Sequence, residues 1–178
     1  MSEEKKTGTR IPLWLAVVIT VGIATPFTFH LGKYNLPLWA SFIVWAEYFA
    51  LGANPSALKL MIPSFSYGCC VVGLWLTTTQ LLAPLMGVEV AFIVGNVIWV
   101  GIGVVIMVSN KILNAGSLAL FNGLSMTLAV YFTGTIPAIG ATNPYAIIWL
   151  AVIWTAIAGY FGAFLGWFNI AIMFPYEK

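Results

Sequence analysis

The sequence predicts an all-α membrane protein, built as one polytopic bundle of about six transmembrane helices. Hydrophobic residues make up 61% of the 178 residues and charged residues only 7%, with a mean hydropathy of +0.99. Because soluble domains carry about 25% charged residues, this chain cannot cover its own surface with polar groups. Its apolar residues also come in long continuous runs, whereas the strands of a membrane barrel alternate. Both observations favour transmembrane helices.

Six runs are apolar enough to be interpreted as membrane spans, each of which needs about 20 residues. In chain order they cover residues 11–31, 36–51, 60–83, 90–109, 115–132 and 144–174. The first run exceeds the apolar core of a signal peptide, about 7–15 residues, so we expect it to remain attached. The second run is short, and the sixth is long enough to tilt. Residues 11–174 then form the membrane domain, with polar tails at 1–10 and 175–178.

The basic residues predict the orientation of this bundle. With six spans and a cytoplasmic N-terminus, the C-terminus also lies in the cytoplasm. All basic residues but one then face inward, as the positive-inside rule requires. Those facing inward are Lys5, Lys6, Arg10, Lys59, Lys111 and Lys178, and Lys33 faces outward. We therefore predict a multi-pass protein of the bacterial inner membrane with both termini in the cytoplasm.

Two similar short segments, GANPSA at 52–57 and GATNPYA at 140–146, precede the third and sixth spans. The side chain of Asn caps free backbone N–H groups at a helix start, and Pro is favoured at the first helical position. Asn54 and Asn143 are therefore expected to start helices. The helices that they start are three spans apart in the chain, so the second helix would cross the membrane in the opposite direction to the first. This pattern leaves open a 3+3 inverted repeat, a common plan in transporters.

Glu47 is the strongest candidate for function because it lies inside the second span. A charged side chain at membrane depth costs about 2.5–3.5 kcal/mol on insertion scales and usually faces the bundle interior. Glu47 could bind a cation, carry a proton or orient a polar solute. Two structural alternatives stay open: an ion pair with Lys59, or a neutral acid hydrogen-bonded to a neighbouring helix.

Other polar, aromatic and small residues complete the candidates. Asn96 and Asn122 are polar groups inside spans, where helix-to-helix hydrogen bonding is their ordinary role. Together with Glu47, Asn54, Asn143 and Tyr48 they are the predicted solute path. An aromatic passage could be formed by Trp45, Tyr48, Phe49, Tyr67 and Trp99. Ala158, Gly162 and Gly166 recur every four residues and predict close helix packing, within the chain or between copies.

This chain lacks the residues that several classes of function require. It has no glycine-rich phosphate loop, no Asp, and one histidine, His30, so a Ser-His-Asp set cannot be built. Cys69 and Cys70 are adjacent in an apolar run, which suits neither a disulfide framework nor a metal site. We therefore expect no enzyme activity, no catalytic residue, no metal and no cofactor. The net charge of +2 is too small to indicate a nucleic-acid partner, and we expect none.

Part of the chain resembles an uncharacterised family of small bacterial inner-membrane proteins that includes YcdZ. The resemblance spans residues 39–132 and begins in LPLWASFIVWAEYFALGANPSALKLMIPSFSYGCCVVGLW. The shared positions there are Trp39, Ala40, Phe42, Tyr48, Phe49, Ala50, Gly52, Leu58 and Lys59. In the later helix pair, Phe121, Asn122 and Gly123 occupy the position of a bend, without the family's proline. The resemblance implies a membrane protein and supplies no substrate.

These observations predict a channel or facilitator for a small neutral or weakly polar solute. Its expected partners are the lipid bilayer, further copies of itself and that solute. Two alternatives stay open. The chain could be a non-transporting assembly subunit of a membrane complex, or a proton-coupled transporter that uses Glu47 as its proton carrier.

Overall fold

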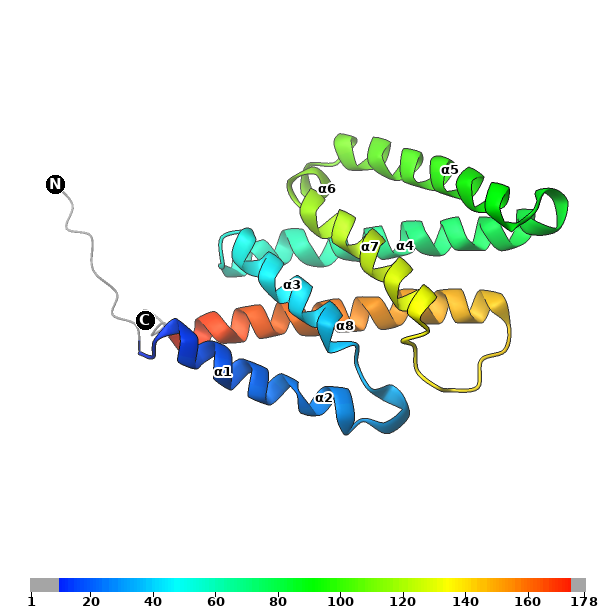
Figure 1. Cartoon of the computed structure of the whole chain (residues 1–178). Helices are drawn as coiled ribbons and strands as arrows, with labels where there is room; N and C mark the ends of the chain where they lie inside the picture. The colour runs from blue at the N-terminus through cyan, green and yellow to red at the C-terminus, as the bar shows by residue number, and fades with distance from the viewer. Residues whose placement is uncertain (1–9, 174–178) are drawn as a thin grey trace.

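The computed structural model describes residues 10–173, which form helices joined by turns and loops, with no β-strand in that range (Figure 1). The prediction of an all-α protein is therefore confirmed. The elements in chain order are α1 (Leu13–Ala24), α2 (Pro26–Phe29), the 3₁₀ turn η1 (Gly32–Tyr34), α3 (Leu38–Ala50), α4 (Pro55–Met86), α5 (Val88–Ser109), α6 (Lys111–Ala115), α7 (Ser117–Thr133) and α8 (Pro144–Met173).

Each predicted span corresponds to a helix, with shifted boundaries. The first run is divided where Pro26 follows Thr25, giving α1 and α2 in place of one helix. The third span begins earlier, because Asn54 caps α4 and Pro55 occupies its first turn. A separate short helix, α6, precedes the fifth span, since Asn110 caps it and Gly116 ends it. The last residue of the sixth span, 174, lies outside the described residues, as do residues 1–9 of the predicted tail 1–10 and the whole predicted tail 175–178.

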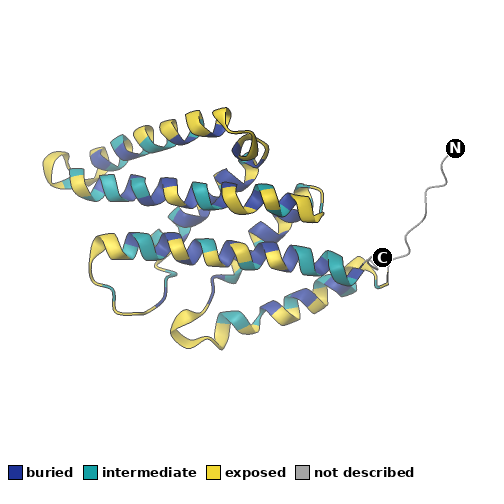
Figure 2. Ribbon diagram, turned by 180° about the vertical axis from the view of Figure 1, so that it is seen from behind, coloured by how far each residue is buried: buried dark blue, intermediate teal, exposed yellow. Residues whose placement is uncertain are grey.

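The helices form two layers. Four of them, in the order α5, α4, α8 and α1, lie side by side with neighbouring helices running roughly antiparallel (Figure 1). Seen from behind, this four-helix layer is in front (Figure 2). The short helices α3 and α7 cross the other face of the layer diagonally. Both pack against the central pair, α7 mainly on α4 and α3 mainly on α8.

The bundle divides into two units of similar construction. In the α4 unit, α4 packs against α5 and α7, while in the α8 unit, α8 packs against α1 and α3. Half a turn about the viewing direction of Figure 1 exchanges α4 with α8, α5 with α1, and α7 with α3. The exchanged helices then run in matching directions. The two units are therefore inverted copies, and the α8 unit combines the two ends of the chain.

Two glycines make the same backbone contact in the two units. An added Cβ on Gly68 of α4 would lie 2.1 Å from the carbonyl oxygen of Leu120 on α7. An added Cβ on Gly162 of α8 would lie 2.1 Å from the carbonyl oxygen of Ser41 on α3. Only glycine permits so close an approach between helix backbones. The crossing helix is thus seated in each unit by an equivalent contact.

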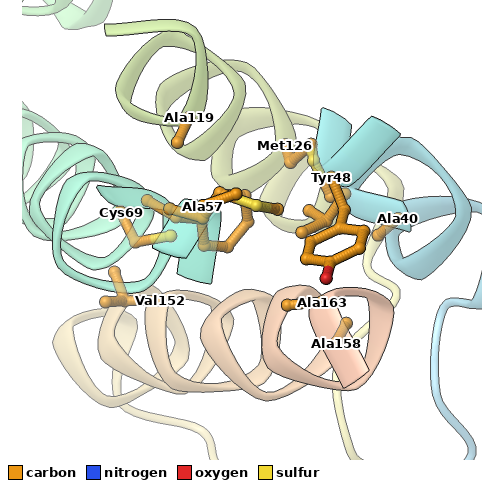
Figure 3. Packing of buried hydrophobic residues seen from close by; sticks show 12 residues of the cluster. Ala40, Tyr48, Ala57, Cys69, Ala119, Met126, Val152, Ala158 and Ala163 are labelled. Atoms are coloured by element: carbon orange, nitrogen blue, oxygen red, sulfur yellow. The ribbon is translucent and has the colours of Figure 1, made fainter. Parts of the chain in front are cut away.

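The main core lies where the two units meet. Its buried residues come from α3, α4, α7 and α8, and include Val44, Tyr48, Met61 and Phe65 (Figure 3). A second cluster fills the α4 unit around Trp75 and Leu76, and a third joins α1, α3 and α8 around Trp45 and Leu165. The buried side chains of the described residues therefore gather in three clusters.

The outer surface of the bundle is as apolar as its interior. The exposed face of α5 carries Val90, Ile93, Val97, Ile98, Ile102, Val105, Ile106 and Val108. On α8, exposed apolar side chains recur at Ile153, Ile157 and Phe164. Such a surface suits contact with lipid. Three described helices, α4, α5 and α8, are long and apolar enough to cross a membrane, and Leu13–Phe29, Leu38–Ala50 and Ser117–Thr133 are shorter apolar stretches.

The charges described by the structure separate to the two ends of the bundle. The start of α1 meets the end of α8, where the backbone N–H of Arg10 donates to the carbonyl of Met173. Lys59, near the start of α4, and Lys111 of α6 lie at this same end. At the opposite end, the carbonyl of Lys33 accepts from Ala138, and Glu89 opens α5. Lys5, Lys6 and Lys178 lie outside the described residues.

Candidate functional site

The candidate site is built around a buried carboxyl group. Glu47 lies near the end of α3 with only 3% of its surface exposed. The side-chain Nδ2 of Asn122 on α7 donates a hydrogen bond of 2.8 Å to Glu47 Oε2. The other carboxyl oxygen, Oε1, is buried and has no hydrogen-bond partner among the described residues. Because α3 and α7 belong to different units, this hydrogen bond joins the α8 unit to the α4 unit.

The structure decides between the two structural alternatives for Glu47. Lys59 is exposed on α4, and no ion pair joins these two described residues. The interpretation as a lysine pair was therefore wrong, because the first turns of α4 direct Lys59 outward. The hydrogen bond to a neighbouring helix is the arrangement found. Asn122, predicted as an ordinary helix-to-helix group, is its partner.

Tyr48, the next residue of α3, turns toward α8 and contributes to the main core. Its side chain is fully buried, and its hydroxyl points toward α8 near Ala158 and Ala163 (Figure 3). Its Cβ would lie 2.7 Å from a methyl group added to Gly166, so only glycine leaves room for it. Glu47 and Tyr48 therefore face different neighbours, Glu47 the α4 unit and Tyr48 the helix α8.

The remaining predicted path residues do not gather at Glu47. Asn54 caps α4 by accepting hydrogen bonds from the N–H groups of Ser56 and Ala57. Asn143 accepts from the N–H of Tyr145 at the start of α8. Both Asn residues are exposed, at opposite ends of the bundle. Asn96 lies on α5, which packs against α4 on the outside of the four-helix layer.

The two Asn-Pro segments both begin with a glycine in the left-handed region, although Ala53 also has a positive φ, of 52°, in the first segment alone. Gly52 and Gly140 adopt positive φ angles of 97° and 77°. Glycine adopts such angles at little cost in free energy, so the chain reverses direction at each of these glycines before the Asn cap. The prediction that both pairs start helices is confirmed by α4 and α8.

The predicted aromatic passage is distributed over three places. Trp45 and Phe49 pack with Phe42 beside α1, Tyr48 lies in the main core, and Tyr67 and Trp99 lie in the α4 unit. Trp99 Nε1 donates to Thr78 Oγ1 at 2.7 Å, and Tyr67 Oη donates to the carbonyl of Gly103. The structure thus uses these side chains to join α4 to α5 and α3 to α1.

The small residues of α8 pack within the chain. Gly162 and Gly166 contact α3, at Ser41 and Tyr48, and Ala158 is fully buried. Gly159, one residue along, contacts the ring of Phe65 on α4. The sequence left open whether this face packs inside one chain or between copies, and these contacts are all within one chain.

A narrow apolar seam lies between α3, α4 and α8, and neither Glu47 nor Asn122 lines it. The seam leaves no room for a water molecule among the side chains of these helices. It is lined by Val44, Met61, Ile62, Phe65, Gly159, Tyr160 and Ala163. A groove of about 180 Å³ continues outward past Ile62 and Tyr160 toward Phe164 and Trp167.

A second polar contact crosses the junction of the two units. Ser66 Oγ on α4 and Tyr160 Oη on α8 lie 2.5 Å apart. Sequence reasoning missed this pair, since a single Ser and a single Tyr in apolar helices give no signal of their pairing. In residues 10–173 no group of three or more His, Cys, Asp or Glu side chains gathers to hold a metal ion.

The helices, the apolar surface and the buried polar pair together define an integral membrane protein of the all-α class. Within this class the chain belongs to a family described as a protein of unknown function (DUF1097), whose model matches residues 15–173. This match spans both units, so the predicted membership of an uncharacterised family is confirmed. The link to YcdZ stays a prediction. No curated protein and no solved structure matches the chain.

Proposed function

We propose that this protein is a facilitator for a small neutral or weakly polar solute in the bacterial inner membrane. The solute path runs along the junction of the two units, past Glu47 and Asn122. The observation that supports this most is the buried carboxyl oxygen without a partner, at the meeting of two inverted units. Ionisable groups at membrane depth are rare and mark functional pathways. Inverted transporters hold their substrates at the interface of the repeats.

The orientation in this proposal follows from the separated charges. Arg10, Lys59 and Lys111 lie at the end of the bundle that carries both termini of the described chain. Under the positive-inside rule this end faces the cytoplasm. Self-association belongs to the proposal too, because α4 and α8 carry exposed apolar side chains such as Ile62, Ile153 and Ile157.

A proton-coupled transporter is the second candidate, and one observation favours it. Glu47 is a carboxyl group with no cation beside it among the described residues, so it can gain and lose a proton without breaking an ion pair. Substitution Glu47→Gln removes this ability. Proton coupling therefore predicts pH-dependent uptake that is lost in Glu47→Gln, whereas a facilitator predicts uptake without a pH gradient.

The proposal is tested by stopped-flow light scattering on proteoliposomes. The panel is urea, acetamide, glycerol, formate and ammonia, with empty liposomes as the background. We expect faster swelling for at least one solute, and a change in its rate when Glu47 is replaced by Met. Glu89→Gln is the matched control, because Glu89 is exposed at the start of α5. Swelling no faster than empty liposomes throughout would contradict the facilitator and favour an assembly subunit.

A further inference from the structure

The protonation state of Glu47 follows from its surroundings. The carboxyl is 3% exposed, and the described residues place no cation within ion-pair distance of it. Burying an ionised carboxylate costs far more than one hydrogen bond from a neutral amide returns. Glu47 is therefore a neutral acid in this structure. Because Oε2 accepts from Asn122, the acid proton belongs on Oε1, the oxygen without a partner.

A neutral acid in this position offers a donor and an acceptor side by side. Oε1–H can donate one hydrogen bond, and Oε2 keeps a second lone pair beside the one that Asn122 uses. We propose that the solute is a planar molecule with a carbonyl next to an N–H group, an amide or a urea. Its carbonyl accepts from Glu47 Oε1, and its N–H donates to Glu47 Oε2. This inference rests on the facilitator function proposed above.

The pairing discriminates between solutes of similar size. An alcohol such as glycerol carries its donors and acceptors on a flexible chain, so pairing with both carboxyl oxygens orders rotatable bonds that a planar amide does not have. An ammonium ion would need the ionised carboxylate. The apolar seam between α3, α4 and α8, with Val44, Met61 and Phe65 on its walls, offers such solutes no further hydrogen bonds. Selection therefore depends on the carboxyl group itself.

The same geometry makes an unusual prediction for Gln. The amide of Gln presents an N–H donor and a carbonyl acceptor side by side, as the neutral acid does. Glu47→Gln should therefore keep the pairing with an amide solute, although it carries no acid proton. Glu47→Met has similar length and lacks both groups. Proton coupling predicts instead that Glu47→Gln loses uptake, so this variant distinguishes the two mechanisms.

The test measures swelling of proteoliposomes in urea, acetamide and glycerol, after subtraction of empty liposomes. We expect urea and acetamide to exceed glycerol by a factor of about five or more for the hydrogen bond gained. Glu47→Gln should keep this preference, and Glu47→Met should reduce amide swelling to background. Elution of each variant as one symmetric peak in size-exclusion chromatography serves as the folding control, with Glu89→Gln as the matched variant.

Each other outcome overturns the inference. If glycerol swells the vesicles as fast as urea in the wild type, the facilitator stands and the amide class is wrong. This comparison needs no variant, so it holds even where Glu47→Met does not fold. If Glu47→Gln loses amide flux as Glu47→Met does, the acid proton is required and the pairing is wrong. If no solute swells the vesicles, the facilitator and the amide class both fail.

Discussion

The hydrogen bond between Asn122 and Glu47 joins two residues that are 75 positions apart in the chain. Glu47 stands out in the sequence because placing an acid inside a membrane span costs free energy, and such residues usually have a function. Asn122 stands out only as one of several amides. That the two meet could not be predicted, since it depends on how α3 and α7 cross the four-helix layer. Lys59, nearer in sequence, was the wrong partner for the same reason.

Removing Asn122 should cost more than removing the whole pair. In Asn122→Leu, Glu47 keeps a buried carboxyl with no donor, and we expect the free energy of unfolding to fall by about 1–3 kcal/mol. In the double variant Glu47→Leu/Asn122→Leu both polar groups are gone, so we expect a smaller loss than in Asn122→Leu alone. Unfolding in mixed micelles by SDS, followed by tryptophan fluorescence, measures both. Additive losses would show that the two side chains do not interact.

At the scale of single elements, hydropathy located every long helix but not the interruptions. The Asn caps of α4 and α8 are local features, so the sequence predicted both helix starts. The break between α1 and α2 follows Thr25 and comes at Pro26, a local signal that the apolar run concealed. Pro63 and Pro84 lie inside α4 without ending it, because packing on neighbouring helices holds it together. Proline alone therefore could not be used to divide the spans.

The two glycine contacts predict a matched pair of unstable variants. In Gly68→Ala and Gly162→Ala the new methyl group would meet a carbonyl oxygen of the crossing helix. The backbones must then separate, so we expect each variant to lose about 1–3 kcal/mol. Gly101→Ala on α5 is the control, because its methyl group meets nothing within 4 Å. SDS unfolding compares all three, and a loss at Gly101 equal to the others would contradict the explanation.

The helix caps predict a smaller effect at the two Asn residues. Asn54→Ala removes the acceptor for the N–H groups of Ser56 and Ala57, and Asn143→Ala that for Tyr145. We expect each to lower the free energy of unfolding by about 0.5–2 kcal/mol. Asn54→Asp and Asn143→Asp keep an acceptor and should stay close to wild type. An Asp variant as unstable as its Ala counterpart would argue against capping.

For the whole molecule, the order of the helices in space was beyond the sequence. The repeat was expected between the first and second groups of three spans. The structure has this relation, because α1, α3 and α4 correspond in chain order to α5, α7 and α8. Each long helix nevertheless packs with the shorter helices of the other half, so the α8 unit combines both ends of the chain. The two segments with Gly, Asn and Pro were the only visible sign of this relation. Glycine contacts such as Gly68 with Leu120 also reflect this relation. They could not be predicted, because they depend on distances between helices.

The central claim of this account is that α4 and α8 begin on opposite faces of the membrane. It is tested most directly by cysteine labelling in intact cells, with Cys69 and Cys70 first replaced by Ala. Ser56→Cys and Thr142→Cys each place one exposed thiol beside an Asn cap. A membrane-impermeant maleimide should label Thr142→Cys from outside, and Ser56→Cys only after the cells are opened. Labelling of both positions from the same side would contradict the inverted arrangement.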